Sequence, residues 1–227
     1  MHQLNSQNQA LLLIDLQNEG GTSAVEGMDE IIKKTANVIK VCRQKNIPII
    51  YTRHINRGDG IGLANLEPVD QNGKPLYYNT NTDSIDIIEE LKNQPGDIIV
   101  DKYRYSGFHE SSLDLMLKSL NIKNLIVGGV LTDVCVLSTV MDAYYRDYQV
   151  NLVKDICGTT TVGAHMAAVC MMGNWVYDIS IFDADQICNK LLGEPYHAWE
   201  SSMPDELQFT PDNLREVYNK LTANCTV

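Results

Sequence analysis

Six short apolar runs, spaced along the whole chain and separated by amphipathic segments, constrain the fold more than any other feature of this sequence. The runs are Ala10–Ile14, Pro48–Tyr51, Ile98–Val100, Leu125–Val127, Val150–Val153 and Ile179–Phe182. Each has the length of a strand and little polar alternation, which is typical of strands buried on both faces of a parallel sheet. Right-handed crossovers through the intervening helices then predict an α/β fold, a Rossmann-like three-layer α/β/α sandwich around a six-stranded parallel sheet.

The chain divides into a main domain and a tail. Its 227 residues are enough for one domain with a full core. We expect residues 1–192 to form that domain and residues 193–227 to form a C-terminal extension with a short amphipathic helix at Asn213–Leu221. The segment Arg53–Thr82, rich in Gly, Asn, Asp and Pro, is longer than an ordinary connection and is predicted to be a functional or interface loop.

Charge and cysteine content exclude several kinds of partner. The net charge of −11 argues against binding to nucleic acid or to anionic lipid. No apolar run has the length of a membrane span, and the N-terminal residues lack the pattern of a secretion signal. The six cysteines show no spacing typical of a metal site. We therefore expect a cytoplasmic protein with reduced thiols, no nucleic-acid partner and no membrane partner.

Residues capable of chemistry follow three of the predicted strands. Asp15 follows the first run and Lys102 the third, and Cys135 lies in the first turn of a predicted helix after the fourth. Ligands of parallel α/β sheets bind beyond the carboxyl ends of the strands. A helix N-terminus and an ammonium group both stabilise a thiolate, so we expect a lowered pKa for Cys135, with Asp15 as proton acceptor. Ordinary roles stay open for each residue: a helix cap, a solvated lysine, a buried cysteine in the core.

Three segments of the sequence resemble the signature segments of isochorismatase-like cysteine hydrolases. They read LLLIDLQNE, DKYRYSGFHESSLDLMLKSLNIKNLIVGG and VLTDVCVLSTVMDAYYRDYQV, in the family's order and separation. The resemblance covers about residues 8–192. Its most specific part is the pattern Gly-x-x-Thr-Asp-x-Cys-Val at Gly129–Val136, and the Asp-x-Gln at Asp15–Gln17 supports it.

The resemblance implies both a site and a sheet order. It assigns a catalytic triad to Asp15, Lys102 and Cys135, with the cysteine as nucleophile. It implies a cis peptide bond between Val130 and Leu131, which directs the N–H groups of Leu131 and Cys135 into an oxyanion hole. The family's strand order, 3-2-1-4-5-6, places Asp15 opposite Cys135. A homo-oligomer, either dimer or tetramer, acting on a small-molecule amide is also implied.

Two departures from family patterns narrow the implied activity. Isochorismate-cleaving members lack the nucleophile, whereas this chain has Cys135. Nicotinamidases carry an Asp-x-His metal cluster after the second strand, and Thr52–Gly60 contains none. We therefore expect no metal and no cofactor, and an amidohydrolase that cleaves a small linear amide or carbamoyl (ureido) compound through a thioester. The alternatives are a nicotinamidase-type hydrolase and a non-catalytic α/β module that binds a small metabolite.

Further polar and aromatic residues near the strand ends are candidates for substrate contacts. They are Gln17, Arg53, His54, Arg104, Tyr105, Phe108 and Thr132. Arg53 and His54 have structural alternatives in loop packing or an ion pair, and Phe108 has one in the core. Thr132 can instead cap the helix that follows the fourth run. His165 is expected to be a hydrogen-bonded structural histidine.

Overall fold

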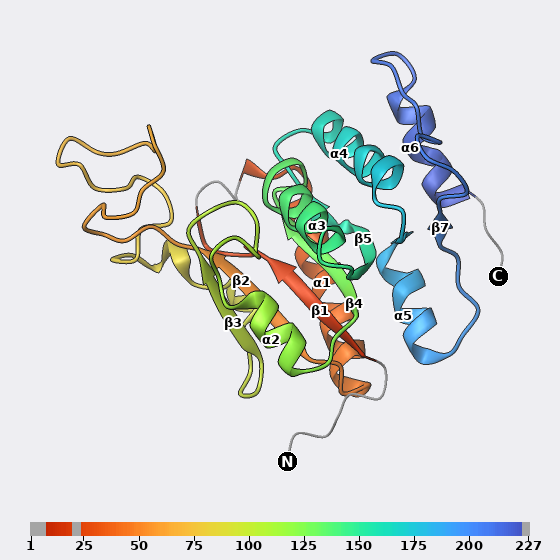
Figure 1. Ribbon diagram of the computed structural model, residues 1–227, viewed down its shortest axis with the longest axis horizontal. Helices are drawn as coiled ribbons and strands as arrows, with labels where there is room; N and C mark the ends of the chain where they lie inside the picture. Colours follow the sequence, from red (N-terminus) through yellow and green to blue (C-terminus); the bar gives the residue numbers. More distant parts are fainter. Residues whose placement is uncertain (1–7, 20–23, 224–227) are drawn as a thin grey trace.

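The computed structural model describes residues 8–19 and 24–223 (Figure 1). Its strands are β1 (Gln9–Ile14), β2 (Ile49–His54), β3 (Ile98–Lys102), β4 (Asn124–Val130), β5 (Gln149–Gly158), β6 (Ile179–Phe182) and β7 (Trp199–Glu200). Its α-helices are α1 (Met28–Gln44), α2 (Leu113–Ser119), α3 (Leu137–Tyr144), α4 (Val162–Trp175), α5 (Ala184–Leu192) and α6 (Leu214–Ala223). Shorter helical turns are η2 (Asp83–Ile85), η3 (Glu89–Leu91) and the π-helical η4 (Thr132–Val136).

The strands form one sheet in the order β3-β2-β1-β4-β5-β6-β7. Every pairing among β1 to β6 is parallel, which confirms the predicted α/β class and the order 3-2-1-4-5-6. The seventh strand, β7, pairs antiparallel with β6 at the edge of the sheet, and the prediction of six strands omits it. A strand of two residues is too short to leave a periodic pattern in the sequence.

Helices cover both faces of the sheet, which gives the predicted three layers. The helices α1 and α5 pack on one face, and α2, α3, α4 and α6 pack on the other. In β1, Leu12 and Ile14 belong to the core on the α3 side, whereas Leu11 and Leu13 belong to the core on the α1 side. This double burial explains why the apolar runs lack polar alternation. None of the described helices has both the length and the apolar character needed to cross a bilayer.

Several strands extend beyond their apolar runs. The strand β2 continues through His54 and β3 through Lys102, because ladder hydrogen bonds depend on the backbone and not on side-chain polarity. In the β2–β3 register His54 lies opposite Lys102, and Arg53 lies opposite Asp101. Successive side chains in a strand point to opposite faces. His54 and Lys102 therefore share one face of the sheet edge, and Arg53 and Asp101 share the other.

An irregular connection, drawn in orange to yellow at the left of Figure 1, joins β2 to β3. Residues 55–97 contain no α-helix and no strand of the sheet. Backbone hydrogen bonds hold the connection: Asn56 N–H donates to the Tyr78 carbonyl at 2.7 Å, and Thr80 N–H donates to the Asn56 carbonyl at 2.9 Å. These bonds return the loop to the carboxyl end of β2. The loop predicted at Arg53–Thr82 makes up much of this connection.

The tail that follows α5 packs into the same core as the rest of the chain. Leu207, Val217 and Leu221 are between 2% and 5% exposed and belong to the core cluster on the α4 side. The Asn174 side chain binds the Leu207 N–H at 2.7 Å and the Leu207 carbonyl at 3.3 Å. The predicted amphipathic helix is present as α6. The separation of residues 1–192 from residues 193–227 as distinct units remains a prediction.

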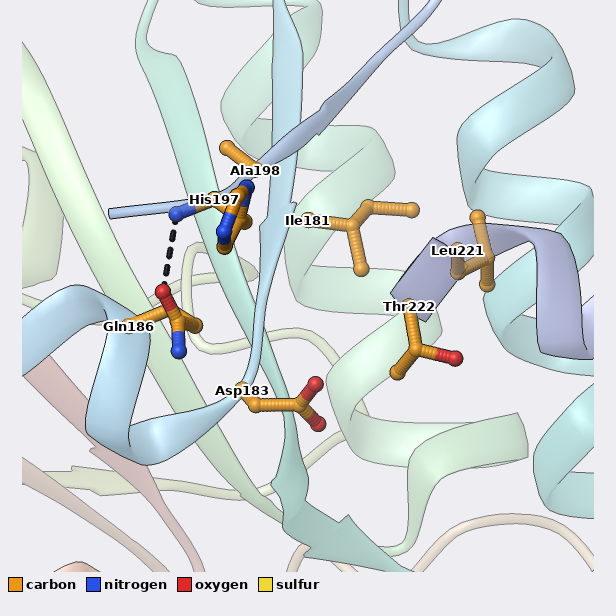
Figure 2. A pocket seen from close by; sticks show the side chains of 7 residues that line it. All are labelled: Ile181, Asp183, Gln186, His197, Ala198, Leu221 and Thr222. Atoms are coloured by element: carbon orange, nitrogen blue, oxygen red, sulfur yellow. Dashed lines mark hydrogen bonds between the residues drawn. The ribbon is translucent and has the colours of Figure 1, made fainter. Parts of the chain in front are cut away.

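The tail also borders a small cavity of about 80 Å³ beside β6 (Figure 2). Its lining residues are Ile181, Asp183, Gln186, His197, Ala198, Leu221 and Thr222. The backbone N–H of His197 donates to the Gln186 side chain at 2.8 Å, which ties the approach to β7 onto α5. Because β6 lies two strands away from β4 in the sheet order, this cavity belongs to the packing of the tail and not to the β1–β4 edge.

The docked tail gives a prediction about stability. Leu207→Ala should lower the free energy of unfolding by about 2–5 kcal/mol, because it leaves a cavity in a buried cluster. Leu115→Ala is the matched control, since Leu115 is 63% exposed on α2 and should change stability by less than about 0.5 kcal/mol. Urea unfolding measures both. Equal stability of the two variants would show that the tail is a passive extension.

Candidate active site

The buried ammonium group of Lys102 lies between a carboxylate and a thiol. Its Nζ atom is 2.6 Å from Asp15 Oδ2 and 3.5 Å from Cys135 Sγ. The exposed fractions of Lys102, Asp15 and Cys135 are 0%, 2% and 7%. Asp15 Oδ1 accepts a hydrogen bond from Thr52 Oγ1 at 2.7 Å. Apart from its ion pair, Oδ2 keeps free acceptor capacity within the described structure, so it can take the thiol proton.

Close backbone packing brings Asp15 and Cys135 together. Asp15 follows β1 with a φ of 51°, a left-handed conformation that turns the chain out of the strand. Gly129 pairs with Ile14 across β4 and β1, and a Cβ atom at Gly129 would lie 2.1 Å from the Ile14 carbonyl oxygen. Glycine is therefore required for β4 to approach β1 this closely. The Val130–Leu131 peptide bond is cis, at the position implied by the family resemblance.

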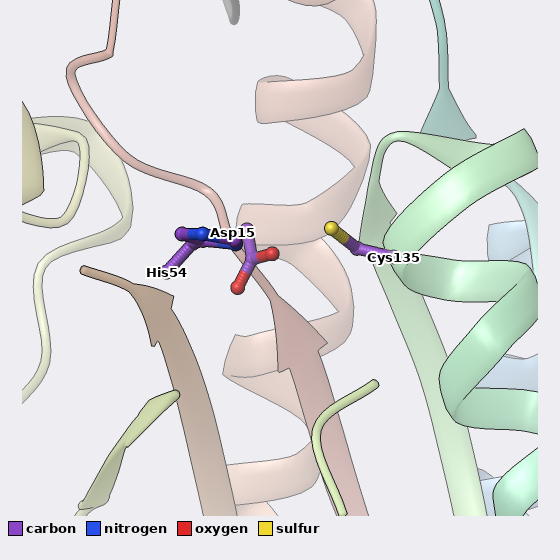
Figure 3. Close-up of side chains that lie close together, drawn as sticks. All are labelled: Asp15, His54 and Cys135. Atoms are coloured by element: carbon purple, nitrogen blue, oxygen red, sulfur yellow. The ribbon is translucent and has the colours of Figure 1, made fainter. Parts of the chain in front are cut away.

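His54 forms a compact cluster with Asp15 and Cys135, whose sulfur points toward the other two side chains (Figure 3). Ligand atoms of the three lie within 4.8 Å of one another, close enough for a metal ion. However, Lys102 Nζ lies 3.4 Å from His54 Nδ1 as well as beside the carboxylate and the thiol. The ammonium already supplies the positive charge there and would repel a second cation. This donor set therefore does not fit a metal.

The His54 ring is neutral in this environment. Burial and the Lys102 charge lower the pKa of His54 to about 4. At neutral pH its Nδ1 atom can accept a hydrogen bond from the Lys102 ammonium, 3.4 Å away. The histidine thus helps to hold the lysine without adding charge to the site.

The expectation of a lowered pKa for the Cys135 thiol is wrong. Burial raises this pKa most, Asp15 raises it further, and Lys102 acts in the opposite direction. The expected helix cap is also absent, because η4 begins the segment as a π-helical turn with no side-chain cap. Burial raises the pKa of the other described thiols too, while Cys225 lies outside the described residues. To act as a nucleophile Cys135 would therefore need a base, and Asp15 is the adjacent carboxylate.

An open cavity of about 400 Å³ leads to the thiol. Its lining residues are His54, Ala64, Asn65, Leu66, Glu67, Pro68, Tyr77, Tyr78, Tyr105, Leu131, Val134 and Cys135. The β2–β3 connection supplies one wall, and η4 with the preceding Leu131 supplies the facing wall. The ring centroids of Tyr78 and His54 are 4.6 Å apart, and the Tyr78 N–H donates to the Glu19 carboxylate at 2.5 Å. The cavity has the size of a small-molecule site.

Two of the predicted substrate contacts, His54 and Tyr105, line this cavity. Gln17 does not, because its fully buried amide exchanges two hydrogen bonds with the His54 backbone, at 2.8 and 3.0 Å. Arg53 does not either, since it forms a bidentate pair with Asp101 on the other face of the sheet edge. Gln17 therefore fixes the end of β2. Arg53 forms an ion pair, which is the structural role named above as the alternative to substrate contact.

The remaining predicted contacts are also absent from the cavity lining. Phe108 is 5% exposed and stacks on Tyr148 in the core. Arg104 donates to two loop carbonyl groups and lines a neighbouring cavity. Thr132 is fully buried, and its hydroxyl is 2.9 Å from His165 Nδ1. His165 accordingly has the hydrogen-bonded structural environment expected of it, with its ring attached to the turn that carries the thiol.

Sequence reasoning missed the residues of the loop wall. Glu67, Tyr77 and Tyr78 line the cavity, and Glu19 holds the Tyr78 backbone. The long irregular loop marked the region, and its adjacent tyrosines are the one compositional signal that could have drawn attention to them. Backbone hydrogen bonds between distant residues decide which loop residues face the cavity, and such bonds leave no local pattern in the sequence.

Curated relatives resemble this chain over most of its length. An uncharacterized isochorismatase family protein of Bacillus subtilis, YaaI, is 28% identical over 82% of this chain and 100% of its own length. Nicotinamidase 3 of Arabidopsis thaliana is 29% identical over 83% of this chain and 91% of its own length. The ureidoacrylate amidohydrolase RutB of Pseudomonas savastanoi pv. phaseolicola is 33% identical over 61% of this chain and 66% of its own length.

Solved structures share the fold. A cysteine hydrolase from Pseudomonas syringae pv. phaseolicola has a TM-score of 0.73 and 24% identity, covering 82% of this chain and 93% of that chain. An isochorismatase family protein from Burkholderia thailandensis has a TM-score of 0.71 and 24% identity, covering 82% of this chain and 96% of that chain. The sequence profile of the isochorismatase domain matches residues 9–180. This match spans more than half of the chain, and the chain therefore belongs to the isochorismatase family of hydrolases.

Proposed function

We propose that this chain is a cysteine-dependent amidohydrolase with Cys135 as nucleophile, Asp15 as general base and Lys102 as supporting cation. The observation that carries the proposal is one buried ammonium in contact with both the carboxylate and the thiol, at 2.6 and 3.5 Å. The thiol also borders an open cavity of small-molecule size. The names of two relatives, an amidohydrolase and a nicotinamidase, support cleavage of a small amide.

In the first half-reaction the Cys135 thiol gives its proton to Asp15 Oδ2 as the sulfur attacks the substrate carbonyl carbon. The substrate oxygen becomes anionic and accepts hydrogen bonds from the backbone N–H groups of Leu131 and Cys135, the proposed oxyanion hole. Asp15 then passes the proton to the substrate nitrogen, the C–N bond breaks, and ammonia or an amine leaves. Lys102 remains charged throughout and stabilises the negative charge on carboxylate and sulfur.

In the second half-reaction water hydrolyses the thioester. Asp15 takes a proton from the water as its oxygen attacks the acyl carbon. The carbon–sulfur bond then breaks, and the proton returns from Asp15 to Cys135. The acid or carbamate product leaves, and the site regains its resting protonation. The substrate is a small linear amide or a carbamoyl (ureido) compound, and the active protein is proposed to be a homo-oligomer.

Two alternative functions have distinct signatures. Similarity to Nicotinamidase 3 favours a nicotinamidase-type hydrolase, which predicts tightly bound metal and turnover of nicotinamide. The lack of an Asp-x-His sequence at Thr52–Gly60 is an argument against that metal site. A non-catalytic metabolite-binding module predicts ligand binding without release of ammonia. A screen for ammonia release from small linear amides, ureido acids, carbamoyl compounds and nicotinamide, together with metal analysis of the protein, separates all three.

The triad assignment predicts non-additive losses of activity. Cys135→Ala and Asp15→Asn should each lower kcat/KM by about 10³-fold or more, because the groups act as one unit. The double variant should lose little more than either single variant. Asparagine is the suitable replacement for Asp15 because it tolerates the left-handed backbone found there. Initial rates on the best substrate of the screen measure the effect.

Controls separate chemistry from folding in that experiment. Cys157→Ala removes another buried thiol and should keep most of the activity. Lys102→Met leaves the buried Asp15 charge unpaired and should lower stability by about 3–5 kcal/mol, so its activity is compared only where circular dichroism shows a folded chain. Substantial turnover by folded Cys135→Ala or Asp15→Asn would contradict the assignment.

Metal removal gives a separate prediction. Dialysis against EDTA should leave kcat and KM unchanged, because the Lys102 ammonium supplies the positive charge of the cluster. Elemental analysis of the purified protein provides the control. Stoichiometric zinc or iron, with loss of activity on removal and recovery on its return, would favour the nicotinamidase-type reading instead.

A further inference from the structure

Cationic side chains near the candidate active site are already engaged. Arg53 forms a bidentate pair with Asp101, with donor–acceptor distances of 2.8 and 3.0 Å. Arg57 forms one with Asp59, at 3.1 and 2.6 Å. Arg104 lines the neighbouring cavity, and its guanidinium donates to two carbonyl groups of the chain. Arg53 and Arg57 are thus each paired with a carboxylate, whereas Arg104 is held by neutral carbonyl groups and is not part of the lining of the cavity that leads to Cys135.

The Lys102 ammonium is equally occupied. It has three N–H donors, and four groups surround it: Asp15 Oδ2 at 2.6 Å, the Arg104 carbonyl oxygen at 3.1 Å, His54 Nδ1 at 3.4 Å and Cys135 Sγ at 3.5 Å. The Asp15 carboxylate already balances its charge. A substrate carboxylate in the cavity would therefore find no free donor on Lys102.

The described residues that line the cavity add negative charge and aromatic surface. Glu67 is the charged side chain among them, and Tyr77, Tyr78 and Tyr105 supply aromatic rings. Burial raises the pKa of the Tyr78 phenol most, and nearby acidic groups, Asp15 first and then Glu19 and Glu67 among them, raise it further. The Glu67 carboxylate in the lining disfavours an anion in the cavity.

From these contacts we propose that the cavity selects amides without negative charge, whether neutral or cationic, and rejects those that carry a carboxylate. The inference rests on the proposed function and specifies its substrate class. A carboxylate would lose its hydration without gaining a cationic partner among the described residues that line the cavity, which costs free energy. An apolar or cationic substituent can contact the tyrosine rings, and a cation is also attracted by Glu67. The net charge of −11 opposes the approach of anions as well.

A pair of alkylating reagents tests this charge preference without knowledge of the substrate. Iodoacetamide is neutral and iodoacetate is anionic, and both transfer a small group to a cysteine sulfur. Peptide mapping measures the rate of alkylation at Cys135 by each reagent. The ratio of the iodoacetamide rate to the iodoacetate rate at Cys135 in the urea-unfolded chain is the reference. In the folded protein the iodoacetamide-to-iodoacetate ratio should exceed the reference at least about tenfold, the factor that corresponds to 1.4 kcal/mol.

Glu67→Gln should lower that ratio toward the reference, because it removes the negative charge of the lining. The matched control is Glu110→Gln, which removes an acidic group from the neighbouring cavity and should leave the ratio unchanged. Turnover supplies the second readout: butyramide should have a higher kcat/KM than succinamate, its carboxylate-bearing analogue. 4-Aminobutyramide, with an ammonium group, should also exceed succinamate.

The possible outcomes distinguish this inference from the proposed function. A Cys135 ratio equal to or below the reference, or a preference for succinamate that Arg104→Gln abolishes, would overturn the charge selection while leaving amide hydrolysis intact. Failure of every amide and carbamoyl compound in the screen, with the alkylation ratio as expected, would overturn the proposed hydrolase and leave the charge preference of the cavity standing.

Discussion

The buried ion pair between Lys102 and Asp15 is the interaction on which the candidate active site depends. Asp15 follows β1 and Lys102 ends β3, with β2 between them, so ordinary strand spacing separates their backbones by roughly 10 Å. The long lysine side chain crosses β2 and brings its ammonium to 2.6 Å from the carboxylate. Neither charge is tolerated alone at this depth, since a buried unpaired ion costs several kcal/mol. The pair therefore ties the carboxyl ends of three strands to one geometry.

The same ion pair influences the protonation of Cys135, the proposed nucleophile. Lys102 favours the thiolate of Cys135, but burial and Asp15 favour the thiol, so the resting sulfur keeps its proton. The charges of the Asp15 carboxylate and the Lys102 ammonium cancel, so this group of residues presents no net charge to an incoming substrate. A nucleophile then forms by moving one proton from Cys135 to Asp15. On the substrate side, Arg53 and Arg57 are paired with carboxylates, and the described lining of the cavity contains Glu67 but no lysine or arginine.

The fold and the proximity of Asp15, Lys102 and Cys135 were predictable for physical reasons, whereas the cavity was not. Burial of β1 on both faces leaves an uninterrupted apolar run, and parallel strands place Asp15, Lys102 and Cys135 at one edge. The cavity wall of residues 64–78 depends on hydrogen bonds such as that between Asn56 and the Tyr78 carbonyl, which no periodic pattern reveals. The direction of the thiol pKa was wrong because sequence reveals a nearby cation but neither burial nor the distance to Asp15.

The central claim is that Asp15 takes the Cys135 proton, and the pH dependence of iodoacetamide alkylation at Cys135 tests it most directly. In the wild-type chain a proton that moves from sulfur to Asp15 is not lost to solvent, so the rate should be nearly constant around neutral pH. In Asp15→Asn the proton must go to solvent, and the rate should rise about tenfold per pH unit below the thiol pKa. A wild-type rate that rises with pH as steeply as the rate of Asp15→Asn would contradict the account.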